Sequence, residues 1–480
     1  MKKNDLIELT ITDMGVGGEG IGKDGAFPFF VKGAVIGDRI IAGVTKVKKT
    51  YAYARLVRIL SPSPVRVSPA CSAAGPCGGC SLQALSYEEQ VRWKVRKVSS
   101  DLIRIGGFSA ETVEAVMEAP LFSEKPYRYR NKMEIPVGRD RNGHLTAGFY
   151  ASHSHRIVPA ADCMLGACVN RQIIEIVLAH MMRCDIEPYD ETTGHGLVRH
   201  IMTRIGEGTG EIMVCLVLNG RHLPGAQELA DALFGIRGVV SFLINVNENR
   251  TNVILGEETI VVRGKDQVTD VLCGLSFRIS PRSFYQVNHD QAQRLYEKVL
   301  EYADLHGAQT VWDLYCGIGT ISLCLAREAG QVYGVEIVPE AVRDAEENAA
   351  LNGITNVHFF CGKAEEVFAR EMAQASGAET DGDGTAGSGT AAGGQGISVR
   401  PDVAVVDPPR KGCDGALLQT LLDMRPDRIV YVSCDSATLS RDLKILCAQD
   451  YRIERACVCD QFSQTVHTES VVKLARKVID

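Results

Sequence analysis

Alternating apolar and polar positions mark the first 60 residues as a small all-β unit. Runs of this kind occupy residues 6–11, 26–31, 38–47 and 51–59. Glycine-rich turns separate them, and the first turn, residues 15–22, contains a GxGGxG string. In a dinucleotide site that string lies between a strand and a helix, whereas further strands follow it here. We therefore expect a small OB-like β-barrel over residues 1–60.

A helical pattern begins after a Ser-Pro-Ser-Pro linker. Apolar side chains recur every three or four residues from Tyr87 to Ile105, and two glycines end the run. Ser86, with Glu89 three residues later, predicts a capping box. The basic side chains fall mostly off the apolar stripe. The pattern predicts a packed helix over residues 86–106 with a solvated basic face.

The pattern changes further along the chain. Strand-like runs, among them residues 211–218 and 239–246, mix with helices as far as residue 280. From residue 311 strands and helices alternate, which predicts a doubly wound parallel sheet. Residues 374–398 interrupt this alternation with Gly, Ala, Ser and Thr, and they predict a flexible inserted loop without chemistry.

These patterns predict a multidomain protein. We expect the barrel at residues 1–60, a central α+β domain with a cysteine cluster at residues 61–280, and a C-terminal α/β doubly wound domain at residues 281–480. The helix over residues 86–106 is a candidate to pack on the C-terminal domain. Residues 127–132 interleave aromatic and basic side chains, which suits either RNA contact or a surface strand.

Charge is divided unevenly along the chain. Its 480 residues include 52 Lys and Arg and 59 Asp and Glu, for a net charge of −7. Residues 1–100 hold 15 basic and 8 acidic side chains, so a basic N-terminal fifth precedes an acidic body. This division suits a polyanion contact confined to that part, or equally a chance distribution of solvated charges.

Neither secretion nor membrane insertion is expected. No uncharged apolar run approaches the roughly 18 residues of a membrane span. Acidic residues near the start, where a signal peptide is apolar, argue against export. Sixteen cysteines in a chain expected to be cytoplasmic then indicate thiol chemistry or metal binding rather than disulfides.

A cofactor site is predicted in the C-terminal domain. Residues 311–320 form a strand that ends in a glycine turn and enters a helix, and Gly317 and Gly319 let a ligand approach the backbone. The next strand ends in Glu336, 23 residues after Asp313, where a carboxylate can accept both ribose hydroxyls of an adenosine. The third glycine of a pyrophosphate site is missing, so S-adenosylmethionine fits better than NAD.

Two further strings are expected at the same edge of the sheet. Asp-Pro-Pro-Arg at residues 407–410 follows the fourth strand, where a doubly wound methyltransferase holds its acceptor. The fifth strand delivers Ser-Cys-Asp at residues 433–435. Cys434 is therefore a candidate nucleophile, and a buried, inert cysteine is the alternative.

A cysteine cluster is predicted before the central sheet. Cys71, Cys77 and Cys80 lie in a loop rich in glycine and proline, and they need a fourth ligand. Four thiolates suit either zinc or a [4Fe–4S] cluster, and the spacing alone leaves both open. The spacing differs from the CxxxCxxC of radical enzymes, so we expect a centre that is structural or that positions RNA.

Together the strings resemble the RNA uracil-5-methyltransferase family. They are residues 313–317 (Asp-Leu-Tyr-Cys-Gly), 407–410 (Asp-Pro-Pro-Arg), 433–434 (Ser-Cys), 467–469 (His-Thr-Glu) and 283–288 (Ser-Phe-Tyr-Gln-Val-Asn). Residues 1–60 look like a TRAM RNA-binding domain. The resemblance covers nearly the whole chain, and its motifs follow the family's order.

The resemblance implies roles for individual residues. Cys434 matches the nucleophile and Glu469 the general base, and Phe284 matches a position near the extruded uracil. The positions that contact S-adenosylmethionine or the target base correspond to Gln286, Tyr315, Glu336 and Asp407. Two positions depart from the pattern: Ser436 stands where proline is common, and Lys363 stands where Asn or Asp often contacts the cofactor.

The resemblance also implies a metal centre. Cys71, Cys77, Cys80 and Cys163 look like the family's iron–sulfur ligands, with Cys168 as the rival for the fourth position. A [4Fe–4S] cluster is therefore expected.

The implied reaction is S-adenosylmethionine-dependent methylation of uracil C5 in RNA. C5 is too weak a nucleophile to take a methyl group directly, so Cys434 would first add to C6, and Glu469 would later remove the C5 proton. A TRAM-like domain together with a cluster points to 23S ribosomal RNA as the substrate. Transfer RNA methylation and a non-catalytic RNA-binding factor are the alternatives. An iron–sulfur redox enzyme is disfavoured because no flavin fingerprint is present, and no protein partner is implied.

Overall fold

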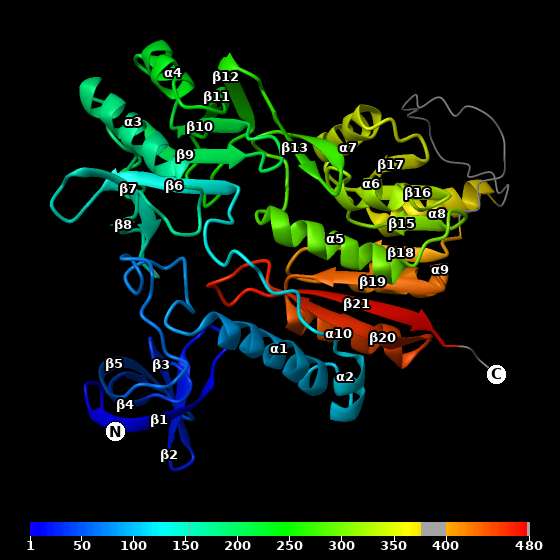
Figure 1. Ribbon diagram of the computed structural model, residues 1–480, viewed down its shortest axis with the longest axis horizontal. Coiled ribbons are helices and arrows are strands. Elements are labelled where there is room, and N and C mark those ends of the chain that lie inside the picture. Colours follow the sequence, from blue (N-terminus) through cyan, green and yellow to red (C-terminus); the bar gives the residue numbers. More distant parts are fainter. Residues whose placement is uncertain (153, 376–399, 478–480) are drawn as a thin grey trace.

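The molecule has three parts, which Figure 1 shows in colours from blue to red. The computed structural model describes residues 1–152, 154–375 and 400–477. The first part is a closed barrel, and the second and third are each built on a seven-stranded sheet. Of the loop expected at residues 374–398, the first two residues end a helix and the others lie outside the described residues.

The N-terminal barrel confirms the predicted β unit. Its strands are β1 (Leu6–Met14), β2 (Gly20–Asp24), β3 (Phe27–Lys32), β4 (Arg39–Val47) and β5 (Ala52–Ser61), in the order β1-β2-β3-β5-β4. Alternate side chains, such as Leu9 and Phe29, fill the interior. β2 comes from the run predicted as a turn. A Cβ at Gly20 would lie 2.9 Å from the carbonyl oxygen of Ala34, so glycine is what lets the chains approach there.

Helix α1 (Tyr87–Arg104) follows the barrel, and α2 (Ala110–Val116) comes next. α1 begins after Ser86, as predicted. The prediction of a capping box is wrong, because no side chain caps the helix. Glu89 instead forms ion pairs with two arginines of the following turns.

The predicted solvated basic face of α1 is confirmed at Arg92 and Arg96, which are exposed, but it is wrong at Lys94. Lys94 is fully buried, because it forms an ion pair with Asp460 of the C-terminal part. The apolar stripe, including Val98 and Leu102, joins the core of the C-terminal part. Figure 1 shows α1 lying along α10 and β20, which come from the other end of the sequence.

The central sheet has the order β12-β11-β10-β9-β6-β7-β8, and its pairs are antiparallel except for β10 with β11. Helices α3 and α4 cover one face, and the other face packs against the C-terminal core. Strands β9 to β11 are therefore buried on both faces. The elements are β6 (Lys132–Arg139), β7 (Leu145–Tyr150), β8 (Ile157–Pro159), α3 (Val169–Arg183), β9 (Val198–Ile205), β10 (Ile212–Leu218), α4 (Ala226–Phe234), β11 (Val239–Val246) and β12 (Glu258–Gly264).

The C-terminal sheet confirms the predicted doubly wound fold. Its order is β17-β16-β15-β18-β19-β21-β20, and only β21 runs antiparallel to the other six strands. One face is covered by α5 to α7 and the hairpin β13–β14, and the other by α1 and α8 to α10. The elements are β13 (Val268–Leu272), β14 (Leu275–Ile279), α5 (His289–Ala303), β15 (Thr310–Asp313), α6 (Thr320–Ala326), β16 (Gln331–Glu336), α7 (Pro339–Leu351), β17 (Val357–Cys361), α8 (Ala364–Ala375), β18 (Val403–Val406), α9 (Gly415–Met424), β19 (Arg428–Ser433), α10 (Ser436–Ala448), β20 (Tyr451–Cys459) and β21 (Glu469–Arg476).

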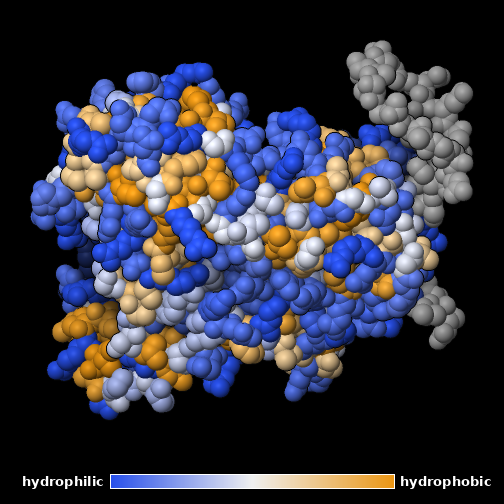
Figure 2. Space-filling view, turned by 45° about the horizontal axis from the view of Figure 1, so that its top comes forward, coloured by the Kyte–Doolittle hydropathy of each residue, from blue (hydrophilic) through white to orange (hydrophobic). Residues whose placement is uncertain are grey.

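Hydrophilic side chains predominate on the surface shown in Figure 2, where apolar side chains gather in separate patches. Among the residues described, no helix combines the length and the apolar character needed to cross a membrane.

Candidate active site

The predicted site residues gather at the carboxyl edge of the C-terminal sheet. Strands β15, β18 and β19 run parallel and side by side, so the residues that follow them emerge at one edge. Asp407 directly follows β18, Cys434 directly follows β19, and Tyr315 lies two residues beyond β15. We call this edge the rim.

Cys434 and Glu469 lie near each other, because β19 ends just before Cys434 and the neighbouring β21 begins at Glu469. β21 runs antiparallel to β19, and Ser433 pairs with Ser470. The next residue after β19 is Cys434, and the residue before Ser470 is Glu469, so each lies one residue beyond the last paired position, and the charge of Glu469 acts on Cys434. Glu469 is only 2% exposed, whereas Cys434 stays partly accessible. Strand pairing thus brings together a thiol and a carboxyl group that are far apart in the chain.

Burial and negative charge raise the pKa values at the rim. Burial, followed by the charges of Glu469 and Asp407, raises the pKa of the Cys434 thiol to about 11, while the Arg410 guanidinium opposes the shift. Burial, with a contribution from Asp313, raises the pKa of Asp407 to about 7. Burial and then Asp407 raise the pKa of Glu469 well above its usual range. The three acidic groups at the rim therefore keep their protons to a higher pH than they would in water. An added positive charge would lower their pKa values and favour the ionised forms.

The glycine turn after β15 leaves room for a ligand. Gly317 and Gly319 have φ values of +55° and +82°, a region that favours glycine. A Cβ at Gly317 would meet no atom within 4 Å. Glu336, at the end of β16, accepts a hydrogen bond from the Gly317 amide at 3.2 Å. One carboxyl oxygen of the buried Asp313, at the end of β15, has no hydrogen-bond partner among the described residues.

The remaining predicted residues differ in their surroundings. Gln286 is buried, and its Oε1 accepts a hydrogen bond from Nε2 of Gln461 at 3.1 Å. Phe284 is 71% exposed, although a large aromatic side chain is usually buried, so its ring is free to meet a partner. The exposed Lys363 pairs with Glu366 at 3.0 Å, and its ammonium group is thus directed to its own helix.

Comparison with known proteins agrees with this geometry. The family model for tRNA (uracil-5-)-methyltransferases matches residues 243–477, and the TRAM domain model matches residues 2–57. An uncharacterized RNA methyltransferase of Halalkalibacterium halodurans is 44% identical over 99% of this chain and 98% of its own length. The chain belongs to the RNA uracil-5-methyltransferase family. A second RNA methyltransferase, from Clostridium tetani, is 42% identical over 98% of this chain and 96% of its own length.

A solved structure is similar to this chain over nearly its whole length. The crystal structure of Pyrococcus abyssi tRNA (uracil-54, C5)-methyltransferase in complex with S-adenosyl-L-homocysteine is 26% identical, with a TM-score of 0.74. The match covers 98% of this chain and 100% of that chain. The protein is therefore an S-adenosylmethionine-dependent RNA methyltransferase with an N-terminal TRAM domain.

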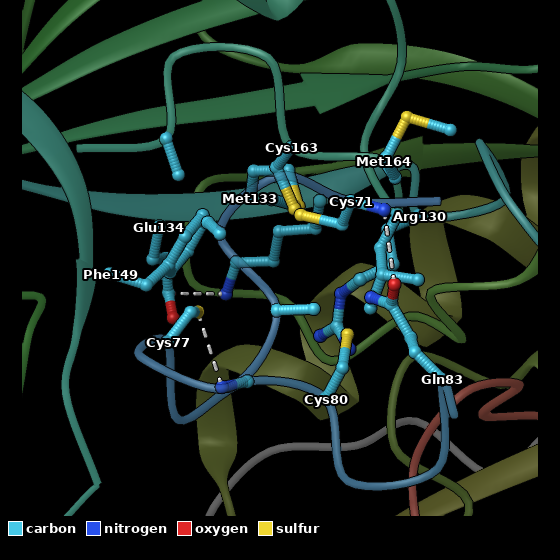
Figure 3. Close-up of a pocket in the computed structure, with 16 residues that line it drawn as sticks. Cys71, Cys77, Cys80, Gln83, Arg130, Met133, Glu134, Phe149, Cys163 and Met164 are labelled. Carbon is cyan, nitrogen blue, oxygen red and sulfur yellow. Dashed lines mark hydrogen bonds and ion pairs between the residues drawn. The ribbon is translucent and has the colours of Figure 1, made fainter. Parts of the chain in front are cut away.

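The four cysteines expected as metal ligands line one cavity of about 270 Å³. Figure 3 shows Cys71 and Cys163 on one side of the cavity and Cys77 and Cys80 on the other. Burial raises the pKa of Cys80 to about 11, and the neighbouring cysteines add to the shift. Cys168 is exposed and does not line the cavity. In the part of the chain that the structure describes, no three His, Cys, Asp or Glu side chains converge to hold a single metal ion.

Two sets of residues differ from what the sequence suggested. Residues 127–132 were a candidate for RNA contact, but Tyr129 within this run is buried. Its hydroxyl donates a hydrogen bond to the carbonyl oxygen of Ser463 at 3.0 Å, so this side chain is not available to RNA. Arg410 had no predicted role, yet its charge acts on both Cys434 and Glu469. Its place in the Asp-Pro-Pro-Arg string was the signal available in the sequence.

Proposed function

We propose that this protein methylates C5 of uracil in RNA through a covalent bond between Cys434 and C6 of the base, with Glu469 as the general base. The observation that carries the proposal is the pairing of β19 with β21, which brings Cys434 and Glu469 near each other at the rim, where the charge of Glu469 acts on the thiol. C5 and C6 are adjacent ring atoms, so a thiol and a carboxylate held at neighbouring positions suit them.

The two side chains act in sequence. The Cys434 sulfur adds to C6, and the electrons of the C5–C6 double bond move onto the ring as an enolate. C5 then takes the methyl group, and Glu469 removes the C5 proton so that the bond from Cys434 to C6 breaks and the double bond returns. With a thiol pKa of about 11, little thiolate is present at neutral pH. Activation of Cys434 therefore needs positive charge at the rim, which Arg410 supplies in part.

We assign the cofactor site to Gln286, Tyr315, Glu336 and Asp407. Glu336 ends the strand next to the glycine turn, where its carboxylate can accept the ribose hydroxyls. The open space at Gly317 admits a ligand close to the backbone. When bound, S-adenosylmethionine supplies the methyl group on a positively charged sulfonium, and positive charge at the rim favours the ionised forms of its acids. The Pyrococcus abyssi relative, solved with S-adenosyl-L-homocysteine, supports S-adenosylmethionine as the cofactor.

The target base has to leave its stack before it reaches Cys434. Extruding a base from a stack costs a few kcal/mol. Phe284, whose ring is exposed beside the buried Gln286 segment, is placed to stack on the extruded uracil and offset part of that cost.

The barrel offers a second surface for RNA. Its aromatic side chains cluster, with the Tyr51 ring centroid 5.6 Å from that of Phe30 and 5.4 Å from that of Tyr53. Exposed lysine side chains adjoin this aromatic cluster, namely Lys46, Lys48 and Lys49. Aromatic faces with neighbouring cations are typical of surfaces that bind single-stranded RNA.

We expect the triple variant Lys46→Gln, Lys48→Gln, Lys49→Gln to bind RNA more weakly and with a flatter dependence on salt. Each lost phosphate contact lowers the slope of log affinity against log salt by about 0.7 on a single strand. Filter binding between low and moderate salt measures this slope. Lys444→Gln on α10, an exposed lysine away from the barrel, serves as the control, and an unchanged slope in the triple variant would remove the barrel from the RNA site.

We propose 23S ribosomal RNA as the substrate, because the chain carries both a TRAM domain and the cysteine cavity. Transfer RNA is the second candidate, since the full-length relative from Pyrococcus abyssi is named as a tRNA (uracil-54, C5)-methyltransferase. Methyl transfer from labelled S-adenosylmethionine to both RNAs, prepared from cells lacking this protein, decides between them after digestion to nucleosides. Label in 5-methyluridine of one RNA identifies the substrate, and label in neither overturns the proposed function in favour of a non-catalytic RNA-binding factor.

We propose that Cys71, Cys77, Cys80 and Cys163 hold a [4Fe–4S] cluster. Thiols arranged around a cavity of about 270 Å³, rather than converging on one point, fit a group of several metal ions better than a single zinc ion. We expect Cys163→Ser to lose most of the bound iron and Cys168→Ser to keep it. Metal analysis of anaerobically purified protein measures both, and zinc in place of iron would overturn the cluster.

A further inference from the structure

Helix α1 touches both segments that carry the reacting side chains. It belongs to the chain between the barrel and the central sheet, yet it covers part of the C-terminal sheet beside α10 and β20 (Figure 1). Val98 and Leu102 bury the apolar stripe of α1 in that core. Packing alone explains this stripe. It does not explain the polar side chains that α1 also buries.

The first polar contact lies next to Cys434. Ser436 is buried at the first position of α10, two residues after Cys434, and its hydroxyl donates to Oδ2 of Asp101 at 2.5 Å. Nζ of Lys97 donates to the same hydroxyl at 2.5 Å. The intervening Asp435 caps α10 by accepting two backbone amides at 3.0 Å. The turn that carries Cys434 is therefore tied to α1 through one serine.

The identity of residue 436 makes this contact specific to the chain. A proline at the first position of a helix fixes φ and preorganises the turn, but it offers no hydroxyl. Serine lacks that constraint on the backbone. In this chain two hydrogen bonds, one that Ser436 accepts from Lys97 and one that it donates to Asp101, hold the position that a proline ring would hold covalently.

The second polar contact lies on the path to Glu469. Asp460 begins the segment 460–468 that leads into β21, and it is buried. Its carboxylate accepts hydrogen bonds from the Tyr87 hydroxyl at 2.6 Å and from Nζ of Lys94. Lys94 also donates to the Phe462 carbonyl oxygen at 3.0 Å. A buried ion pair adds little net stability over apolar packing, but it accepts few geometries.

We propose that α1 is the positioning element for both reacting side chains: Lys97 and Asp101 set Cys434 through Ser436, and Tyr87 and Lys94 set Glu469 through Asp460. This inference rests on the proposed function. Addition at C6 and proton removal at C5 occur on neighbouring atoms of one ring, so the thiol and the carboxylate must keep a fixed separation. One rigid helix that ties both segments supplies it.

The two ends of α1 are expected to affect different steps. RNA carrying 5-fluorouridine at the target position cannot lose a C5 proton, so it stops at the covalent adduct and reports only addition and methyl transfer. We expect Ser436→Ala to form this adduct about ten- to a hundredfold more slowly. We expect Tyr87→Phe to form it at nearly the wild-type rate, but to turn over ordinary RNA about tenfold more slowly and to accumulate adduct on it.

Matched variants separate positioning from loss of stability. Thr203→Val removes a buried hydroxyl of the central sheet that donates to Oδ1 of Asn170, and Tyr451→Phe removes a buried phenol that donates to the carbonyl oxygen of Pro426. Thermal unfolding is measured for all four variants. If Ser436→Ala and Tyr87→Phe slow the reaction only as their controls do, or slow the same step as each other, the inference is overturned while the proposed function stands. If the wild-type protein forms no adduct, the proposed function is overturned and the inference falls with it.

Discussion

Cys434→Ala is expected to abolish RNA methylation, with a loss of about 10⁴-fold or more in turnover, as for other covalent nucleophiles. Without the sulfur no bond forms at C6, and C5 never gains the electron density that it needs to take a methyl group. RNA affinity should stay within about twofold, because the alanine removes one partly accessible atom from the rim. The measurements are labelled methyl transfer and filter binding on the RNA that the wild-type protein modifies.

The control for Cys434→Ala is Cys361→Ala. Cys361 is an exposed thiol that ends the parallel strand β17, so it lies at the same edge of the sheet. It is expected to keep full turnover, because β17 lies at the far end of the sheet from β19. Residual methylation by Cys434→Ala at more than about a hundredth of the wild-type rate would exclude a covalent mechanism through this thiol.

Glu469→Gln is expected to trap the methylated RNA on the protein and to lower turnover by about 10²- to 10⁴-fold. Glutamine keeps the shape of the buried side chain but cannot accept the C5 proton, so the bond from Cys434 to C6 cannot break. One Glu469 oxygen has no hydrogen-bond partner within the described ranges, which leaves it available to a substrate. A denaturing gel shows the adduct, and mass spectrometry of the peptide with Cys434 places the link.

Glu454→Gln serves as the control for Glu469→Gln. Glu454 belongs to the adjacent β20 and forms an ion pair with Lys473, whereas Glu469 pairs with Cys459 at the other end of that strand. Its loss should leave turnover unchanged and no adduct behind. If Glu469→Gln turns over normally, or if it fails before any adduct forms, Glu469 is not the base that releases the product.

Local pattern is enough to predict the elements that carry the site. Glycines at 317 and 319 mark a turn because only glycine takes their positive φ values without strain. The strands before Asp407 and Cys434 are short apolar runs, and parallel order follows from their alternation with helices. The edge at which these residues meet therefore follows from the sequence alone.

Contacts between distant segments are not visible in the sequence. β2 escapes prediction because glycines that permit close approach of strands look the same as glycines in a turn. The burial of Lys94 could not be predicted from the sequence, because its partner Asp460 lies more than 360 residues away and no pattern within α1 indicates that contact. The separation between Cys434 and Glu469 likewise depends on how β19 and β21 pair.

The sequence by itself determined the fold class of the barrel and of the C-terminal sheet, the family, and the residue types available for chemistry, because periodicity, turn glycines and short motifs are local properties. Only the tertiary structure decided which charges are buried, which thiols share a cavity, and that a helix from the first quarter of the chain packs beside the rim. Burial and pairing across the chain are set by the packing of all parts together, and so are the raised pKa values that follow from them.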